Sequence, residues 1–197
     1  MRLVLASGNA GKVIELEQLL AGSDVHLVAQ TQLGVSDADE TGLTFVENAL
    51  IKARHAARAT GMPALADDSG ICVDALGGAP GLYAARYAGT HGDSAANNAK
   101  LLRELDGIPA ERRQAYFIAV LVVLRHADDP APLIAEGRWH GRILEAPRGN
   151  GGFGYDPLFL PDGYDVSAAE LDPALKNRLS HRGQALAILQ QRFAELA

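Results

Sequence analysis

The sequence predicts a single α/β domain, residues 1–197, in which helices pack against a mixed β-sheet. Two observations support this prediction. In the first third of the chain, short apolar runs alternate with segments whose apolar residues recur at helical spacing. In the middle, two longer β-like segments follow one another across a polar turn, as strands of a hairpin do. No linker rich in Pro, Gly or Ser divides the chain, so one domain is expected.

The predicted elements begin with a strand at 3–6 and a helix with apolar residues from Val13 to Leu20. A second strand follows at 25–29. Thr44 and Glu47 then have the spacing of a capping box, which predicts that a helix begins at this point.

The later elements are mainly strands. A short apolar strand at 63–65 precedes Asp67 and Asp68, which we therefore expect at a strand end. The two hairpin strands are predicted at 115–124 and 132–144, and a terminal helix carries Leu179, Leu186 and Leu189 on one face.

Composition and charge argue against a nucleic-acid-binding protein and against a membrane-spanning one. The 18 Lys and Arg residues against 24 Asp and Glu residues give a net charge of −6, which argues against a nucleic-acid partner. The apolar run at 117–124 is too short to cross a membrane. The single cysteine, Cys72, cannot form an internal disulfide, so a reducing, cytoplasmic location is expected.

The first of four polar segments that suggest chemistry is Ser7-Gly8-Asn9-Ala10-Gly11-Lys12, between the first strand and the first helix. A helix N-terminus with a nearby lysine suits a phosphate group. A plain turn, with Gly for sharp geometry and Asn as a helix cap, fits the same residues equally well. It is not a Walker A loop, because Val13 stands where that motif has Ser or Thr.

The second and third segments carry acids. Glu40 is a candidate metal ligand and Lys52 interrupts the apolar face of its helix, although solvated side chains would explain both. Asp67 and Asp68 are adjacent, and in an extended chain their side chains point to opposite sides. One is therefore expected to face a site, where carboxylate oxygens suit Mg²⁺, unless the pair forms an Asx-type turn.

The fourth segment is the glycine-rich stretch 149–157, followed later by Lys176 and by His181 and Arg182 at a helix start. Phe153 in that stretch is a candidate for stacking on a flat base. Arg182 can donate two hydrogen bonds to a carbonyl edge. For His181, a surface or helix-start position without chemistry is the simpler alternative.

Taken together, the segments resemble those of the Ham1-like family of inosine and xanthosine triphosphate pyrophosphatases over essentially the whole chain. The resemblance rests on motifs that occur in a consistent order: Ser7 to Lys12, Glu40-Thr41-Gly42, Thr44 to Ala49, Ala66-Asp67-Asp68-Ser69-Gly70, Gly77 to Gly81, Phe153-Gly154-Tyr155-Asp156-Pro157 and Ser180-His181-Arg182-Gly183. It implies an elongated mixed sheet flanked by helices, two lobes around a central nucleotide-binding cleft, and a homodimer.

The resemblance also implies a reaction. Water attacks the α-phosphorus of ITP, dITP or XTP with the help of Mg²⁺, and the products are the nucleoside monophosphate and pyrophosphate. The implied metal ligands are Glu40 and Asp68, and Asp68 is also the implied general base. Asp67 could support the metal as well.

The remaining roles implied by the resemblance concern the substrate. The triphosphate would be held by Ser7, Gly8, Asn9, Ala10, Gly11, Lys12 and Lys52; Ser69 would contact substrate; and the nucleoside pocket would comprise Phe153, Gly154, Tyr155, Asp156, Lys176, His181 and Arg182. Two alternatives stay open: a pyrophosphatase that prefers another modified nucleotide, such as a pyrimidine triphosphate, and a sensor that binds nucleotides without hydrolysing them.

Overall fold

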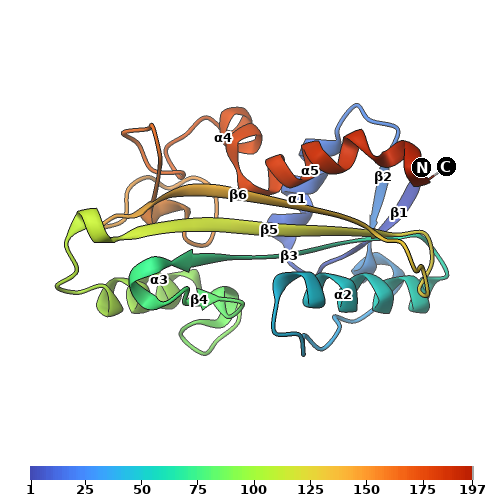
Figure 1. Ribbon diagram of the computed structural model, residues 1–197, viewed down its shortest axis with the longest axis horizontal. Coiled ribbons are helices and arrows are strands. Elements are labelled where there is room, and N and C mark those ends of the chain that lie inside the picture. The colour runs from blue at the N-terminus through green and yellow to red at the C-terminus, as the bar shows by residue number, and fades with distance from the viewer. Residues whose placement is uncertain (197) are drawn as a thin grey trace. The chain divides into compact units, whose positions relative to one another are not determined.

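The computed structural model describes residues 1–196, and within this range the strands form one seven-stranded sheet in the order β2-β1-β3-β5-β6-β7, with β4 paired to β3 (Figure 1). The strands are β1 (Arg2–Ala6), β2 (His26–Ala29), β3 (Ala64–Val73), β4 (Pro80–Gly81), β5 (Gln114–Leu124), β6 (Leu133–Ile143) and β7 (Phe159–Pro161). β1 is parallel to β2 and β3, whereas β4 and β7 are antiparallel to β3 and β6. The prediction of a mixed sheet in an α/β fold is confirmed.

The chain forms two compact units. Unit 1 contains residues 1–68, 119–137 and the chain from Arg182 onward, and unit 2 contains residues 69–118 and 138–181. The strands β3, β5 and β6 contribute residues to both units. The α-helices are α1 (Ala10–Leu20), α2 (Phe45–Thr60), α3 (Ser94–Glu104), α4 (Pro173–Leu179) and α5 (His181–Gln191).

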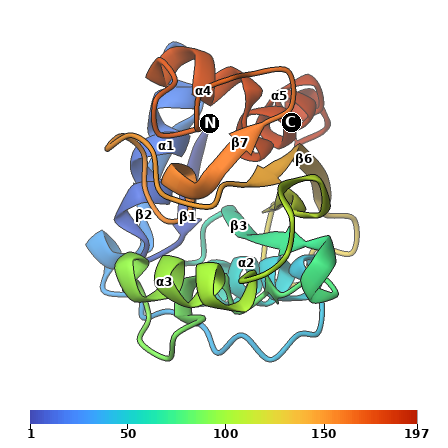
Figure 2. The same cartoon turned by 90° about the vertical axis from the view of Figure 1, so that its left-hand side faces the viewer.

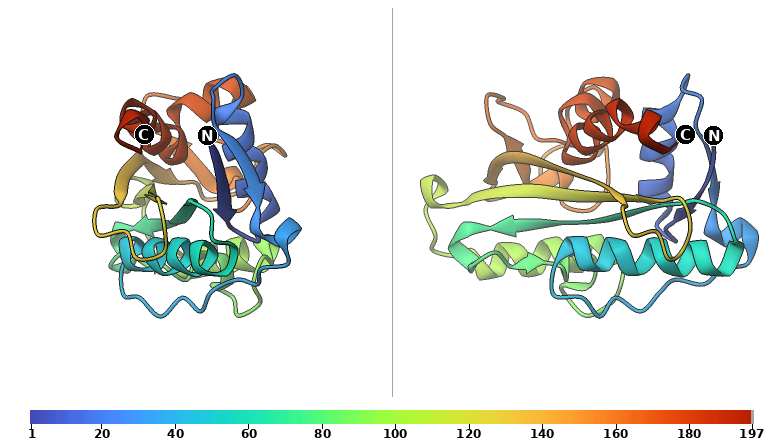
Figure 3. Two further views of the ribbon diagram at one scale, coloured as in Figure 1. Left: turned by 90° about the vertical axis from the view of Figure 1, so that its right-hand side faces the viewer. Right: turned by 45° about the vertical axis from the view of Figure 1, so that its right-hand side comes forward.

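Unit 1 has a hydrophobic core on each face of its part of the sheet. On one face, Leu16 of α1 and Leu186 of α5 pack with Leu5 and Leu121 of the strands. On the other face lies α2, whose buried side is almost entirely alanine (Figures 1 and 3). Alanine side chains are short and allow a helix to pack closely, and Lys52, in the middle of α2, reaches Asp68 of β3.

The core of unit 2 combines aliphatic residues with buried aromatic rings. Phe117, Trp139 and Phe159 form a cluster with ring centroids 4.7–6.4 Å apart. The helices α3 and α4 flank the strands of this unit (Figure 2). Trp139 is 6% exposed, so it is a packing residue.

The structure corrects two sequence-based expectations and adds one helix that was not predicted. β3 continues to Val73, so Asp67 and Asp68 lie inside a strand and not at its end. Leu179 belongs to α4, a separate short helix that begins after the Asp172 cap, and not to the terminal helix. The helix α3 was not expected, because only Leu101 among its few apolar residues is buried against the core.

Several boundaries are confirmed. Thr44 caps α2, and its hydroxyl group accepts the Glu47 backbone N–H, as a capping box requires. β5 and β6 match the two predicted hairpin strands to within two residues. No helix within residues 1–196 is both long and apolar enough to cross a bilayer.

Candidate functional site

The turn from Ser7 to Lys12 leads from β1 into α1 and is stabilised by its own side chains. Asn9 caps α1 by accepting the Lys12 backbone N–H at 3.1 Å, and the Ser7 hydroxyl accepts the Asn9 N–H at 3.2 Å. A Cβ atom at Gly8 would lie 2.6 Å from Asp37 Oδ2, so a larger residue there would require the exposed Asp37 side chain to move. The cap and the turn predicted as a structural alternative are both present, and they direct Lys12 toward β3.

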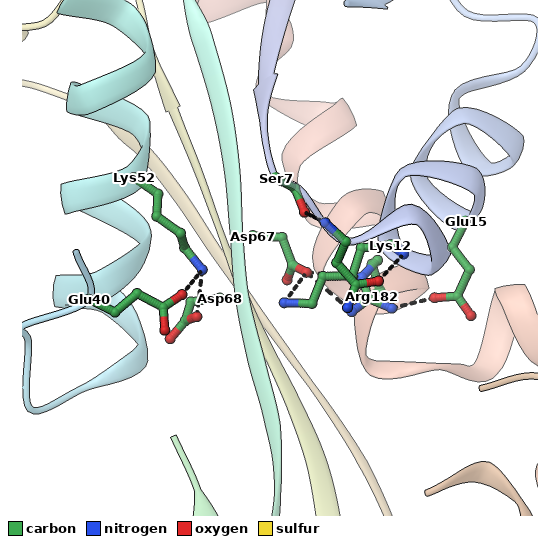
Figure 4. Close-up of polar contacts among 9 residues, drawn as sticks. Ser7, Lys12, Glu15, Glu40, Lys52, Asp67, Asp68 and Arg182 are labelled. Carbon is green, nitrogen blue, oxygen red and sulfur yellow. Dashed lines mark hydrogen bonds and ion pairs between the residues drawn. The ribbon is translucent and has the colours of Figure 1, made fainter. Parts of the chain in front are cut away.

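Asp67 is the centre of a buried ionic network (Figure 4). Its Oδ2 atom lies 3.1 Å from Lys12 Nζ and 3.2 Å from Arg182 Nη2. Arg182 is 1% exposed and also donates to Glu15. Burial alone would raise the pKa of Asp67, but the charges of Arg182 and Lys12 outweigh it and hold this pKa well below its usual range. Asp67 is therefore a fixed negative charge between two cations.

Asp68 points to the other side of β3, as the alternation along a strand predicts (Figure 4). Its Oδ1 atom lies 2.6 Å from Lys52 Nζ, and the same ammonium group lies 3.1 Å from Glu40 Oε1. Burial raises the pKa of Asp68 despite the nearby lysine. Burial opposes the charge on Lys52, yet Asp68 and Glu40 together raise the pKa of this lysine. Lys52 thus brings two carboxylates together at one point.

The donor set on this side of β3 suits a hard divalent cation. Glu40 and Asp68 offer carboxylate oxygens, which Mg²⁺ prefers, and Mg²⁺ in nucleotide sites takes one or two carboxylates and completes its shell with phosphates and water. Within residues 1–196, no group of three or more His, Cys, Asp and Glu side chains forms a protein-only metal site. The residues therefore fit a metal that arrives with a phosphorylated ligand.

In unit 2, Asp156 organises the glycine-rich loop. Its Oδ2 atom accepts the Phe153 backbone N–H at 2.8 Å and lies 2.8 Å from Lys176 Nζ. Lys176 Nζ also lies 5.3 Å from the centre of the Phe153 ring, and that ring is 38% exposed. The loop thus presents a partly exposed aromatic residue beside a buried lysine.

The other residues predicted to contact substrate, including Ser69, have positions or contacts in the fold that the structure describes. The Tyr155 hydroxyl donates to the Ala84 carbonyl at 2.8 Å, and Tyr155 is buried. The His181 ring stacks on Phe117 with centroids 4.9 Å apart. Ser69 follows Asp68 in β3, and the Gly154 carbonyl accepts a hydrogen bond from Asn98. The roles of these residues toward a substrate remain predictions.

Four residues that the structure connects to these clusters were not among the predicted site residues. They are Glu15, which pairs with Arg182; Asp37, which lies against Gly8; Asn48, which accepts the Gly42 N–H; and Asn98, which donates to Gly154. Asn48 lies within the motif from Thr44 to Ala49, which could have indicated it, whereas the other three lie outside the quoted motifs. Their contacts are identified by the tertiary structure.

Comparison with known proteins identifies the family of the chain. The sequence profile described as "Ham1 family" matches residues 3–192, nearly the whole chain. The chain belongs to the Ham1 family. A relative in Xanthomonas campestris pv. campestris is 66% identical over 195 residues, which cover 99% of this chain and 98% of the relative, and it is named dITP/XTP pyrophosphatase.

Solved structures of Ham1 proteins have the same fold. A HAM1 protein from Coxiella burnetii is 48% identical, with a TM-score of 0.90 over 99% of both chains. A protein from Mycobacterium abscessus, titled nucleoside-triphosphatase / dITP/XTP pyrophosphatase, is 46% identical, with a TM-score of 0.77 over 96% of this chain and 98% of that one. The family predicted from the sequence is confirmed.

Proposed function

We propose that this Ham1 family member hydrolyses deaminated purine nucleoside triphosphates, namely ITP, dITP and XTP, to the monophosphate and pyrophosphate. The name dITP/XTP pyrophosphatase of relatives up to 66% identical supports this activity. The observation that carries the chemistry is the Glu40, Lys52 and Asp68 cluster on β3 and its neighbours. Carboxylates repel a polyanionic substrate unless a cation lies between them. This cluster therefore supports binding of a triphosphate together with a metal ion.

Glu40 and Asp68 are proposed to hold Mg²⁺, which when bound would withdraw charge from the phosphates and favour attack on phosphorus. Asp68 accepts a proton from water as the water oxygen forms its bond to the α-phosphorus. The bond between that phosphorus and the bridging oxygen of pyrophosphate breaks. A carboxylate with a raised pKa is a better proton acceptor than an ordinary one, provided that it is ionised at the working pH.

Lysines carry the second electrostatic task of the reaction, which is to stabilise the charge that accumulates on the leaving pyrophosphate. Lys52 keeps its charge at neutral pH because Asp68 and Glu40 raise its pKa. Lys12 and the N-terminus of α1 are proposed to bind the triphosphate from the Ser7 to Lys12 turn. Asp67 Oδ2 lies 3.1 Å from Lys12 Nζ, and this ion pair fixes the position of the lysine side chain.

The base is proposed to stack on Phe153 and to be recognised by Lys176, His181 and Arg182. Hypoxanthine and xanthine present a carbonyl acceptor at position 6, where adenine presents an amino donor. A lysine or arginine donor satisfies the first and opposes the second, and a bidentate contact of this kind discriminates by about 1–3 kcal/mol. This polarity supports a preference for ITP over ATP.

Three further attributes are proposed on the family resemblance. The chain forms a homodimer, it acts in the cytoplasm on the free nucleotide pool, and by doing so it keeps deaminated purines out of nucleic acids. A reducing compartment agrees with the single cysteine, Cys72, whose thiol is free and buried.

The test is to incubate the purified protein with Mg²⁺ and, separately, with ITP, XTP, dITP, GTP, ATP and dUTP, and to identify the products. We expect monophosphate and pyrophosphate from the first three nucleotides and little product from the others. Turnover mainly of dUTP or another nucleotide would overturn the proposed base recognition. Tight binding without turnover of any nucleotide would indicate the sensor instead.

A further inference from the structure

We propose that Asn48 is a positioning residue, whose side chain holds the turn at 39–43 so that the Glu40 carboxylate meets Lys52 and Asp68. This inference rests on the proposed function, in which Glu40 is a metal ligand. Asn48 itself is not proposed to contact a substrate or a metal. It acts through the backbone of the turn that carries Glu40.

Residues 35–44 contain no helix or strand, so side-chain contacts determine the path of this segment. Near Glu40, the Gly42 backbone N–H donates to Asn48 Oδ1 at 2.8 Å, and Asn48 is 3% exposed. The next N–H, of Leu43, donates to Glu47 Oε2 in an exposed position. The Asn48 contact is partly buried and the Leu43 contact is exposed, so water competes less with the Asn48 contact, which is the stronger constraint on the turn.

Gly42 provides an independent sign that the turn is seated against α2. A Cβ atom at this position would lie 2.6 Å from the Glu47 Cβ and 2.7 Å from Asn48 Oδ1. Real Cβ atoms do not approach other atoms this closely. The backbone of the turn therefore lies directly on the first turn of α2, at a distance that only glycine permits.

The same helix supplies the partner of Glu40. Asn48 and Lys52 are four residues apart in α2, so their side chains emerge on the same side of the helix. Asn48 holds the backbone two residues after Glu40, and Lys52 Nζ lies 3.1 Å from the Glu40 carboxylate and 2.6 Å from Asp68. Without the Asn48 acceptor, the turn loses its buried anchor and Glu40 loses its fixed position beside Asp68.

The decisive experiment measures metal binding apart from turnover. The variant Asn48→Ala is titrated with Mn²⁺ in the presence of a non-hydrolysable ITP analogue, and bound metal is followed by electron paramagnetic resonance. Outer residues that orient metal ligands commonly affect metal affinity about 10–100-fold, and we expect a loss of about tenfold here. The Mg²⁺ concentration for half-maximal ITP hydrolysis should rise by a similar factor, with most turnover restored at saturating Mg²⁺.

Asn97→Ala is the matched control. Asn97 is also 3% exposed, and its Oδ1 atom accepts the Ala88 backbone N–H at 2.7 Å. It lies in unit 2 and does not contact the segment that carries Glu40. The Asn97→Ala variant should therefore have lower thermal stability and unchanged Mn²⁺ affinity. Unchanged Mn²⁺ affinity in Asn48→Ala, or an equal loss in both variants, would overturn the proposal.

A second variant guards against misfolding of the first. Gly42→Ala pushes the turn away from α2 and should weaken Mn²⁺ binding in the same way as Asn48→Ala. Full Mn²⁺ affinity in a folded Gly42→Ala protein would contradict the proposed constraint. If the wild-type protein hydrolyses no nucleotide, the proposed function fails, whereas the Mn²⁺ titration still decides the role of Asn48.

Discussion

Asp67 and Asp68 are neighbours in the chain, but their pKa values move in opposite directions. Asp67 lies between Arg182 and Lys12, which keep its pKa low, whereas burial raises the pKa of Asp68 despite the charges of Lys52 and Lys12. Strand geometry causes the difference, since one residue step reverses the side of β3 that a side chain faces. Asp68 therefore accepts a proton more readily than Asp67.

The substitution Asp68→Asn tests this assignment. It removes the proton acceptor while keeping the shape of the side chain, and the loss of a general base lowers turnover by about 10²–10⁴-fold. We expect ITP hydrolysis to fall by this factor while the Kd for a non-hydrolysable analogue, measured by calorimetry, changes little. Asp106→Asn, at an exposed position after α3, serves as the control and should retain normal turnover.

The titration of Asp68 in the metal-free protein should agree. Because burial raises its pKa, the Asp68 carboxylate should take up a proton at a higher pH than an ordinary aspartate, as an NMR titration without Mg²⁺ would measure. Near-normal hydrolysis by Asp68→Asn would assign the base to another group.

At the scale of elements, the glycine-rich loop is the one whose backbone geometry bears most on binding. Gly152 has a φ of +68°, and a Cβ atom there would lie 2.1 Å from Asp156 Oδ2. That carboxylate oxygen also accepts the Phe153 N–H and holds Lys176. Close approach of the backbone to Asp156 is therefore what sets the position of the Phe153 ring.

Gly152→Ala should consequently displace Phe153 and raise the KM for ITP several-fold, with a smaller effect on kcat. Gly163→Ala is the control, because Gly163 has a similar φ of +79° and a Cβ atom there meets nothing within 4 Å. Both variants introduce backbone strain of about 1 kcal/mol, but only the first introduces the clash. If steady-state kinetics show the same KM for both variants, the close approach at Gly152 does not set the position of Phe153 for substrate binding.

At the scale of the whole molecule, the ionic network around Asp67 joins parts of unit 1 that are distant in sequence. Lys12 comes from α1, Asp67 from β3 and Arg182 from α5, 115 residues beyond Asp67. Removing one partner of a buried ion pair leaves a buried charge uncompensated, which costs about 3–5 kcal/mol. The stability of the fold should therefore depend on this one carboxylate.

Asp67→Asn should lower the free energy of unfolding at pH 7 by about 3 kcal/mol. The folded-state pKa of Asp67 lies below its unfolded value of about 4, so its contribution is complete above that value and is lost as the pH falls below it. The difference between wild type and variant should narrow by about 1 kcal/mol at pH 3. Urea unfolding at both pH values measures this.

Asp128→Asn is the control for that measurement, since the Asp128 side chain is 86% exposed and its ion pair with Arg58 lies at the surface. It should change stability little at either pH. An Asp67→Asn protein as stable as wild type at pH 7 would show that the network does not stabilise the fold.

The sequence by itself determined the local elements and the chemical types in the site. Helical spacing and the Thr44 cap predicted where α2 begins, and the hairpin pattern predicted the bounds of β5 and β6 to within two residues, because these signals depend on neighbours in the chain. Alternation along a strand predicted that Asp67 and Asp68 diverge. The ordered motifs indicated the Ham1 family, which the comparisons confirm.

Only the tertiary structure decided which of these groups meet. It placed the two aspartates inside β3, paired Arg182 with Glu15 across 167 residues, and set Asn48 against Gly42 and Asp37 against Gly8. The physical reason is that strand order and helix packing bring distant segments together. Those contacts depend on burial and charge in the folded chain, and the local sequence pattern does not contain them.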